Sequence, residues 1–138
     1  MRVVGPEGMA QLAQVLAAAG LPASDIAAPG RAFFAFAGAD GFPVGYGGLE
    51  WHGAEALLRS VVVAPHARRQ GHGKAIIDVL LAEAWSQGAA SAWLLTTSAA
   101  EFFGAQGFTA VERGAVPSSI AGTSQFTSLC PASATVMR

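Results

Sequence analysis

Residues 68–74 carry the clearest chemical pattern in the chain. They read Arg68-Arg69-Gln70-Gly71-His72-Gly73-Lys74, which combines positive charge with two glycines. The apolar run 57–63 before them is typical of a buried strand, and the periodic segment 75–85 after them is typical of a helix. Loop N–H groups and a helix N-terminus that converge on one point bind anions, and glycine lets backbone approach a ligand closely. The segment therefore predicts an anion-binding loop, to which His72 contributes its backbone N–H.

Two common phosphate-binding patterns do not fit this loop. The Walker A pattern requires a wider glycine spacing and a Gly-Lys-Ser/Thr ending, and residues 71–75 have neither. The dinucleotide pattern requires a third glycine in register and an acidic residue about 20 positions later, and both are missing. The loop is therefore of another kind.

Two segments resemble the GNAT acetyltransferases. Residues 63–73 follow Val-x-Pro-x-x-Arg-x-x-Gly-x-Gly and resemble the acyl-CoA pyrophosphate loop of that family, Gln/Arg-x-x-Gly-x-Gly/Ala. Residues 99–108 are similar to the family's A-x-x-F-Y-x-x-x-G-F segment. The resemblance implies acetyl-CoA as cosubstrate, with its pantetheine arm along a central strand. The implied cofactor-binding residues are Val61, Val62, Val63, Arg68, Arg69, Gln70, Gly71, His72, Gly73, Lys74 and Phe103.

The order of expected elements predicts a single α/β domain spanning residues 1–138. Strands are expected at 2–4, 31–38, 44–51, 57–63, 92–97, 108–113 and 133–137. Helices are expected at 6–19, 21–26, 75–85 and 99–106, with a helical turn at 118–122. The usual crossover makes 92–97 parallel to 57–63. The fold is therefore expected to be a GNAT-like mixed sheet of about six to seven strands flanked by helices, in which the family resemblance implies that the central parallel strands splay apart.

Composition excludes several classes of function. The formal charge is −1, and the eight basic residues do not cluster outside 68–69, so nucleic-acid binding is not expected. One cysteine and three dispersed histidines make neither an internal disulfide nor a metal site. No apolar run is long enough to span a membrane, and no signal peptide begins the chain, so a cytoplasmic location is expected.

The candidate catalytic groups depart from the family pattern. Many relatives carry a tyrosine at the position of Phe103, where it protonates the departing thiolate, and a phenyl ring cannot do this. Relatives often place a glutamate near the start of the cofactor strand, where this chain has Leu57-Leu58. Glu50 is the best remaining candidate for the general base, with Arg59 as its natural partner, because an unpaired charge among apolar residues is costly. A Glu50–Arg59 pair that only ties two strands together is an equally weighted alternative.

The acceptor is expected to be a small amine. In the sharper interpretation Arg59 binds an anionic group of the substrate, and Ser60 and Thr97 add hydroxyl contacts. The segments 57–60, 94–103 and 128–134 are similar to short acetyltransferases associated with arsenic-resistance genes. That resemblance implies detoxification by N-acetylation, with an arsinic or phosphinic amino acid as a consistent substrate.

Two other functions remain open from the sequence. The missing tyrosine and early-strand glutamate would also fit a catalytically silent domain that binds acetyl-CoA. Acetylation of a protein N-terminus or lysine is the second alternative, and it would favour an open, acidic groove. No nucleic-acid or membrane partner is expected, and a homodimer is one assembly that the sequence allows.

Overall fold

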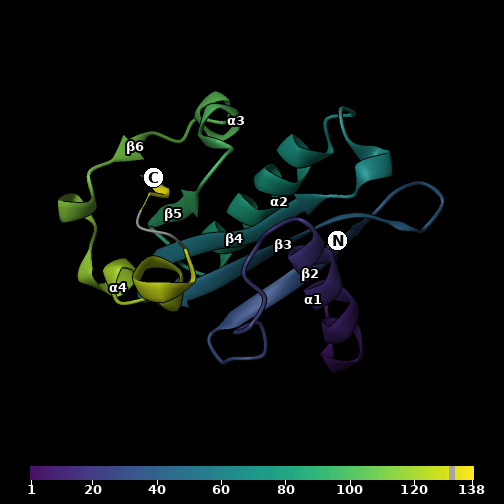
Figure 1. Ribbon diagram of the computed structural model, residues 1–138, viewed down its shortest axis with the longest axis horizontal. Helices are drawn as coiled ribbons and strands as arrows, with labels where there is room; N and C mark the ends of the chain where they lie inside the picture. The colour runs from purple at the N-terminus through teal and green to yellow at the C-terminus, as the bar shows by residue number, and fades with distance from the viewer. Residues whose placement is uncertain (131–132) are drawn as a thin grey trace.

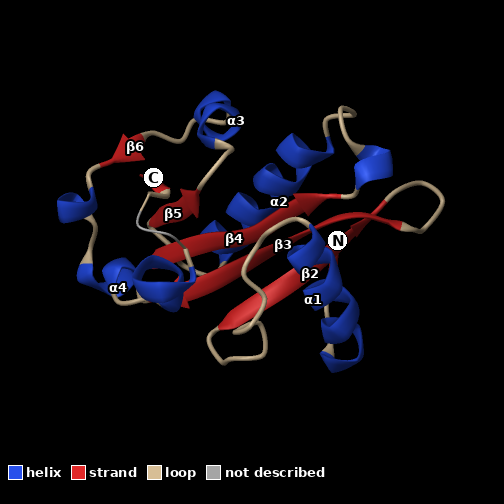
Figure 2. Cartoon of the chain, in the orientation of Figure 1, coloured by secondary structure: helices blue, strands red, loops and turns tan. Residues whose placement is uncertain are grey.

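Seven strands form one mixed β-sheet in the computed structural model, which describes residues 1–130 and 133–138. The strand order is β1-β2-β3-β4-β5-β7-β6, with helices on both faces (Figure 1, Figure 2). The strands are β1 (Arg2–Val3), β2 (Arg31–Ala37), β3 (Pro43–His52), β4 (Glu55–Val63), β5 (Ser91–Thr96), β6 (Ala110–Val111) and β7 (Thr135–Met137). The helices are α1 (Met9–Ala18), α2 (His72–Ser86), α3 (Ala100–Ala105) and α4 (Ser118–Ala121). The predicted mixed α/β sheet of six to seven strands is confirmed.

Side-chain alternation along β2 separates two layers of core. Phe34 and Phe36 pack in the cluster that contains the buried face of α2, while Phe33 and Ala35 pack in the cluster that contains α1. Successive side chains of a strand point to opposite faces, so one strand supplies both clusters. The two helices therefore cover opposite faces of the sheet (Figure 1).

Glycines in β3 let α2 lie close to the sheet. A Cβ built on Gly47 would come within 2.6 Å of Leu80 Cδ1, and one built on Gly45 would come within 2.7 Å of Ile76 Cδ1. Both helix residues are almost fully buried, and burying such a side chain contributes about 1.5–3 kcal/mol. Close packing at this point fixes where α2 begins, and hence where the glycine loop before it lies.

The central parallel strands diverge. β4 pairs with β5 at three positions, Glu55 with Ser91, Ala56 with Ala92 and Leu57 with Trp93. Further along, residues 94–96 of β5 pair with β7, and residues 58–63 of β4 have no β5 partner among the described residues. One edge of β4 is therefore open over its second half, as the family resemblance implied.

Several predicted boundaries differ from the structure. The helix expected at 21–26 is wrong, because residues 24–27 form only a turn in which Ala28 N–H donates to the Asp25 carbonyl at 3.0 Å. The strand expected at 108–113 shortens to Ala110–Val111, since Arg113–Ala115 forms a 3₁₀ turn. The expected helical turn at 118–122 is present as α4, and the last strand begins at Thr135.

Candidate active site

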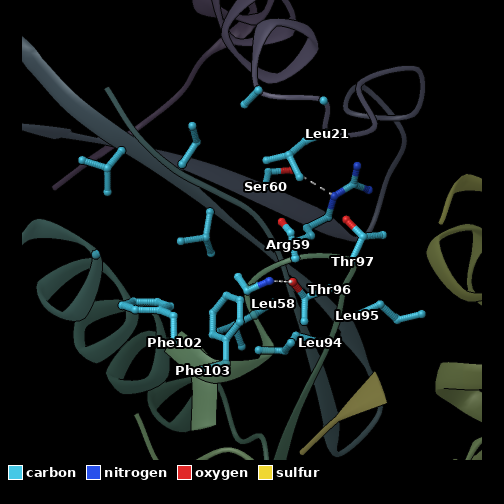
Figure 3. A pocket seen from close by; sticks show the side chains of 18 of the residues that line it. Leu21, Leu58, Arg59, Ser60, Leu94, Leu95, Thr96, Thr97, Phe102 and Phe103 are labelled. Atoms are coloured by element: carbon cyan, nitrogen blue, oxygen red, sulfur yellow. Dashed lines mark hydrogen bonds between the residues drawn. The ribbon is translucent and has the colours of Figure 1, made fainter. Parts of the chain in front are cut away.

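A cavity of about 820 Å³ opens where β4 and β5 diverge. Its walls come from β4, the loop that precedes α2, the end of β5 and the start of α3, together with residues 19–22. Figure 3 shows Phe102 and Phe103 on one side of the cavity, with Arg59, Ser60 and Leu21 across from them. The volume falls within the range of about 300–1,000 Å³ that is typical of small-molecule sites.

The glycine loop at the mouth of this cavity depends on its glycines for conformation and for close contact. Gly71 has a φ of +79° and is the N-cap of α2, and Arg69 also has a positive φ of 66°. A Cβ on Gly73 would lie 3.1 Å from the Phe102 ring, so the backbone packs directly against that ring. Consecutive N–H groups beside a helix N-terminus favour a bound anion. This backbone geometry is the kind expected of an anion-binding loop, and phosphate binding here stays a prediction.

The charged side chains of this loop are exposed. Lys74 Nζ lies 2.7 Å from Asp78 Oδ2 in an exposed ion pair, which contributes little to stability. Arg68 Nε donates to the Val63 carbonyl at 3.2 Å and so covers the end of β4. Gln70 donates weakly to the His66 carbonyl at 3.5 Å and does not line the cavity. Positive charge is thus available at the mouth, while the amide of Gln70 is turned elsewhere.

A β-bulge interrupts β4 where the strand faces the cavity. Tyr46 pairs with Val62 and Gly48 pairs with Arg59, so one residue of β3 opposes two residues of β4. Ser60, in the bulge, has a φ of +58°, which is uncommon for a residue with a side chain. Such positions persist only where surrounding contacts hold them, and they cluster at functional sites.

The Arg59 side chain is buried beneath the bulge and is fully committed. It is 1% exposed. Its five N–H groups donate hydrogen bonds to both carboxylate oxygens of Asp25 at 2.6 and 2.7 Å, to Glu50 Oε2 at 2.8 Å, to Ser60 Oγ at 3.3 Å and to the Pro22 carbonyl at 3.4 Å. A guanidinium has five donors in all. Figure 3 shows the side chain extending away from Phe102 and Phe103, with the bond to Ser60 drawn.

Further charges complete this cluster. Arg31 contacts Asp25 at 2.6 Å and Glu50 at 3.2 Å, and His52 Nε2 lies 2.9 Å from Glu50 Oε1. Two carboxylates thus balance two guanidinium groups whose side chains are at most 15% exposed, which is the pairing that buried charges require. We call Asp25, Arg31, Glu50, His52 and Arg59 the buried charge cluster. It joins the loop after α1 to β2, β3 and β4.

The pKa values in the cluster reflect competition between burial and charge. Burial alone would raise the pKa of the Asp25 carboxyl, but hydrogen bonds and charge from Arg59, and then from Arg31, hold that pKa below its usual range. Burial would likewise lower the pKa of Arg59, and the carboxylates of Asp25 and Glu50 raise it instead. Asp25 and Arg59 are therefore both charged at neutral pH.

Phe103 lines the cavity as part of an aromatic group. Its ring makes an edge-to-face contact with Phe102, at a centroid distance of 5.2 Å, and another with Phe108, at 5.9 Å. It is 8% exposed and offers no hydroxyl. The single tyrosine, Tyr46, packs in the α1 cluster and does not line this cavity. Among the described lining residues, no tyrosine is therefore available to protonate a departing thiolate.

Neutral polar side chains gather along part of the cavity wall. Thr96 Oγ1 accepts from the Ala99 N–H at 3.0 Å and so anchors the start of α3 (Figure 3). Thr97 also lines the cavity, as do Gln125 and Cys130 from the π-helical turn Gln125–Leu129 and the residue after it. Burial raises the pKa of the Cys130 thiol, and the positive charges of Arg59 and Arg113 offset this only in part. Cys130 is therefore a thiol rather than a thiolate at neutral pH.

Most residues predicted from the sequence for the cavity do line it. Those that line it are Arg59, Ser60, Val61, Val62, Val63, Arg68, Arg69, Gly71, His72, Gly73, Lys74, Thr97 and Phe103. Gln70 and Glu50 do not, and Glu50 reaches the cavity only through its bond to Arg59. Sequence reasoning missed Asp25, Arg31, His52 and Gln125.

A family model describes most of this architecture. The model for the Acetyltransferase (GNAT) domain matches residues 29–110, more than half of the chain, from the start of β2 to the start of β6. The chain belongs to the GNAT acetyltransferase family. It is accordingly an acyltransferase with acetyl-CoA as cosubstrate.

Solved structures share the fold of this acetyltransferase at low sequence identity. A GNAT-family acetyltransferase from Staphylococcus aureus is 18% identical with a TM-score of 0.77, covering 98% of this chain and 94% of that one. Rv2747 from Mycobacterium tuberculosis, in complex with CoA and NLQ, is 21% identical with a TM-score of 0.75, covering 99% and 95%. N-acetylglutamate synthase from Neisseria gonorrhoeae, complexed with coenzyme A and N-acetyl-glutamate, is 15% identical with a TM-score of 0.75. It covers 99% of this chain and 33% of that one. No curated protein sequence matches the chain.

The cavity of this acetyltransferase fits the cosubstrate. The open edge of β4 offers backbone to an extended arm, and Gly71 and Gly73 leave the loop backbone accessible at the mouth. Arg69 and Lys74 add positive charge where a diphosphate would lie. Within residues 1–130 and 133–138, no helix has the length and apolar character needed to cross a bilayer.

Proposed function

We propose that this acetyltransferase moves the acetyl group of acetyl-CoA to the amine of a small molecule. The observation that carries the proposal is the continuity of the cavity. A single hollow runs from the glycine loop along β4 to Ser60, Thr97 and Gln125, so a small amine can lie beside the end of the cosubstrate arm. The N-acetylglutamate synthase of similar fold is complexed with coenzyme A and N-acetyl-glutamate, which supports a small amine as the acceptor.

The residues of the chain would divide the work as follows. Backbone groups of Val61, Val62 and Val63 pair with the arm of the cosubstrate as an added strand would. N–H groups of the loop at Gly71 and Gly73 bind the diphosphate, helped by nearby positive side chains. An N–H of the bulged strand faces the position where negative charge develops on the thioester oxygen. Acetyl-CoA supplies the activated acyl group.

The buried charge cluster bears on both predicted roles of Arg59 and Glu50. The sequence predicts that Arg59 binds an anionic group of the acceptor and that Glu50 is the general base. All five donors of Arg59 are already engaged, so an anion could bind there only by displacing Asp25, Glu50, Ser60 or Pro22. Glu50 lies behind Arg59 and is bonded to it. We therefore propose that both are positioning residues, which hold the bulge and the loop after α1.

Arsenic-related chemistry remains a separate proposal. The resemblance to acetyltransferases associated with arsenic-resistance genes suggests an amino acid with an arsinic or phosphinic group as acceptor, which Arg59 would have to release a partner to bind. A cytoplasmic location remains a prediction from the sequence. A homodimer also remains a prediction from the sequence.

Thiol release from acetyl-CoA tests the proposal. The panel contains alkylamines, amino acids, amino-acid amides, a phosphinic amino acid and a lysine-containing peptide. We expect turnover with at least one small amine and slower reaction with the peptide. Turnover with the peptide alone would indicate a protein acetyltransferase. If calorimetry shows tight binding of acetyl-CoA but no acceptor causes thiol release, the result would indicate a catalytically silent domain. Selective turnover of the phosphinic acid would support the anionic alternative.

A further inference from the structure

Gln125 is a buried amide whose N–H₂ group has no hydrogen-bond partner. The residue is 5% exposed and lines the cavity from the π-helical turn Gln125–Leu129. Its Nε2 exposes almost no surface and has no hydrogen-bond partner in the structure. Buried polar groups nearly always have partners, because an unpaired one loses its bonds to water without replacement. The missing partner is therefore the feature to be explained.

The orientation of this amide is fixed from the other side. Cys130 Sγ lies 3.3 Å from Gln125 Oε1, where the thiol donates and the oxygen accepts. Burial raises the pKa of the thiol, so this donor keeps its proton at neutral pH. The Cys130 N–H also donates to the Gln125 carbonyl at 3.0 Å, which closes the π-helical turn. With Oε1 engaged, the side of the amide that is left over is the N–H₂ donor. Single π-helical turns of this kind are frequent at functional sites.

The surroundings of Gln125 indicate what kind of group would pair with it. The guanidinium of Arg59 has no free N–H, and no carboxylate lines the cavity among the described residues. Ser60 Oγ is engaged as an acceptor by Arg59. The uncommitted buried donors of the lining are thus neutral, the Gln125 amide and the Ser60 hydroxyl, and the complement of either is an oxygen that accepts a hydrogen bond.

We propose that Gln125 is an acceptor-selectivity residue: once a small shift of the cavity wall uncovers its Nε2, this atom donates to a carbonyl or carboxylate oxygen that the substrate carries near its amine. This deepens the proposed function and rests on it. The substrate class is an amino-acid-like amine, either the free acid or its amide, in preference to a plain alkylamine. Recognition runs through a neutral amide donor and leaves the Arg59 guanidinium with its partners in the buried charge cluster.

Three acceptors that differ only at the relevant group test this proposal. They are L-alaninamide, L-alanine and isopropylamine, which present a carbonyl, a carboxylate and a methyl group at the same position. The quantity measured is the kcat/KM of each acceptor in a variant divided by that in the parent enzyme. This ratio cancels the differing basicities of the three amines.

Gln125→Met should lower kcat/KM for the two oxygen-bearing acceptors on the order of tenfold more than for isopropylamine, because one hydrogen bond is lost. Gln125→Glu should affect L-alanine more than L-alaninamide, because like charges repel. Cys130→Ala, which frees Oε1, should weaken the discrimination, and Cys130→Ser should restore it. The control is Gln87→Met, at the exposed end of α2 and outside the cavity, which should leave the three ratios equal.

Binding measurements separate selectivity from folding. Calorimetry of acetyl-CoA should give the same Kd for Gln125→Met as for the parent, whereas N-acetyl-L-alaninamide in the presence of CoA should bind about tenfold more weakly. If Gln125→Met does not fold, Gln125→Asn, which withdraws the amide by one methylene, takes its place with the same expectation. Equal effects of either variant on all three acceptors would overturn the inference while leaving the proposed function intact. Failure of the parent to acetylate any small amine of the wider panel, with acetyl-CoA still bound, would overturn both.

Discussion

Glu50 accepts hydrogen bonds from the guanidinium groups of Arg59 and Arg31, and its other oxygen lies 2.9 Å from His52 Nε2. It is 1% exposed. A general base must reach the proton that it removes, directly or through one water. Since the carboxylate has partners on both oxygens and does not line the cavity, we expect it to act by holding Arg59 in place.

Glu50→Gln separates the two roles. We expect the free energy of unfolding to fall by about 1–3 kcal/mol, because an amide N–H₂ would face guanidinium donors. The acidic limb of the kcat/KM profile should keep its shape in the folded fraction. Urea denaturation and a pH–rate profile measure the two effects, with Glu101→Gln, which is exposed, as the control. A lower kcat with a flattened acidic limb and unchanged stability would identify Glu50 as the base instead.

Phe103→Tyr restores the hydroxyl that many relatives carry. The ring lines the cavity but packs edge-to-face on Phe108, with centroids 5.9 Å apart. We expect kcat to be kept or modestly raised, since a phenol can protonate a departing thiolate. Steady-state kinetics with the best acceptor give kcat, and calorimetry gives the Kd of acetyl-CoA. Loss of cofactor binding would mean that the position is packed too tightly to accept a polar atom.

Whether a contact between two residues can be predicted depends on how far apart the residues lie in the sequence. Glu50 and Arg59 could be paired from the sequence because β3 and β4 are joined by a tight turn, which fixes the register of the two strands. Asp25 and Gln125 lie in segments without periodicity. Their contacts depend on where a loop returns in space, and local sequence does not encode this.

Arg59 also acts at the scale of elements, because its partners come from three of them. The loop after α1 contributes Asp25 and Pro22, β3 contributes Glu50, and β4 contributes Ser60. Its guanidinium also lies 5.4 Å from the centre of the Phe33 ring on β2. The side chain therefore sets the position of a loop that has no helix of its own.

Arg59→Leu should lower the free energy of unfolding by about 3–5 kcal/mol, because it leaves two buried carboxylates with fewer partners. Arg59→Lys should recover only part of the loss, since lysine cannot pair with Asp25 in a bidentate manner. Lys74→Leu, which breaks an exposed pair, should change stability by at most about 1 kcal/mol. Urea denaturation compares the three. A raised KM for an anionic amine in Arg59→Leu, with unchanged stability, would support direct substrate binding by Arg59.

Substitutions at Gly71, in the loop before α2, should act through backbone conformation and not through a lack of space for a side chain. A Cβ at Gly71 would meet nothing within 4 Å, but its φ is +79°. Gly71→Val should therefore distort the loop and weaken acetyl-CoA binding at least tenfold, while Gly71→Asn should do so less, since asparagine tolerates this region. Calorimetry gives the Kd values, and circular dichroism checks the fold. Unchanged affinity in a folded Gly71→Val protein would refute the assignment of the loop.

Elements with strong periodicity could be predicted to within a few residues. The periodic patterns in the sequence predict the strands β2 to β5 and the helices α1 to α3. The helix expected at 21–26 fails because Asp25 is held by guanidinium groups from other elements, a tertiary contact that outweighs a weak local preference. The short β6 and the π-helical turn lie where the pattern is weakest.

Asp25 gives the molecule as a whole a pH dependence of stability. In the folded state burial alone would raise its pKa, but Arg59 and Arg31 hold that pKa below the ordinary value. A depressed folded pKa contributes stability that is fully present above the unfolded value of about 3.9 and is lost as the pH falls through the folded value. The difference in the free energy of unfolding between the parent and Asp25→Asn should therefore be constant from pH 7 to about pH 5. It should become smaller at lower pH.

Urea denaturation at several pH values between 7 and 3 measures this difference. Asp78→Asn, at an exposed ion pair, is the matched control and should differ little from the parent throughout. A gap between the parent and Asp25→Asn that stays constant down to pH 3 would show that the acid sensitivity of the fold comes from another carboxyl.

The open edge of β4 has a consequence for how the protein persists in a cell. Among residues 1–130 and 133–138, three residue pairs join β4 to β5, and the second half of β4 has no β5 partner. A ligand that occupies this seam binds the folded chain and not the unfolded one, and at one hundred times its Kd such a ligand adds about 2.7 kcal/mol to stability. The susceptibility of the folded chain to proteolysis should therefore fall as the concentration of acetyl-CoA rises.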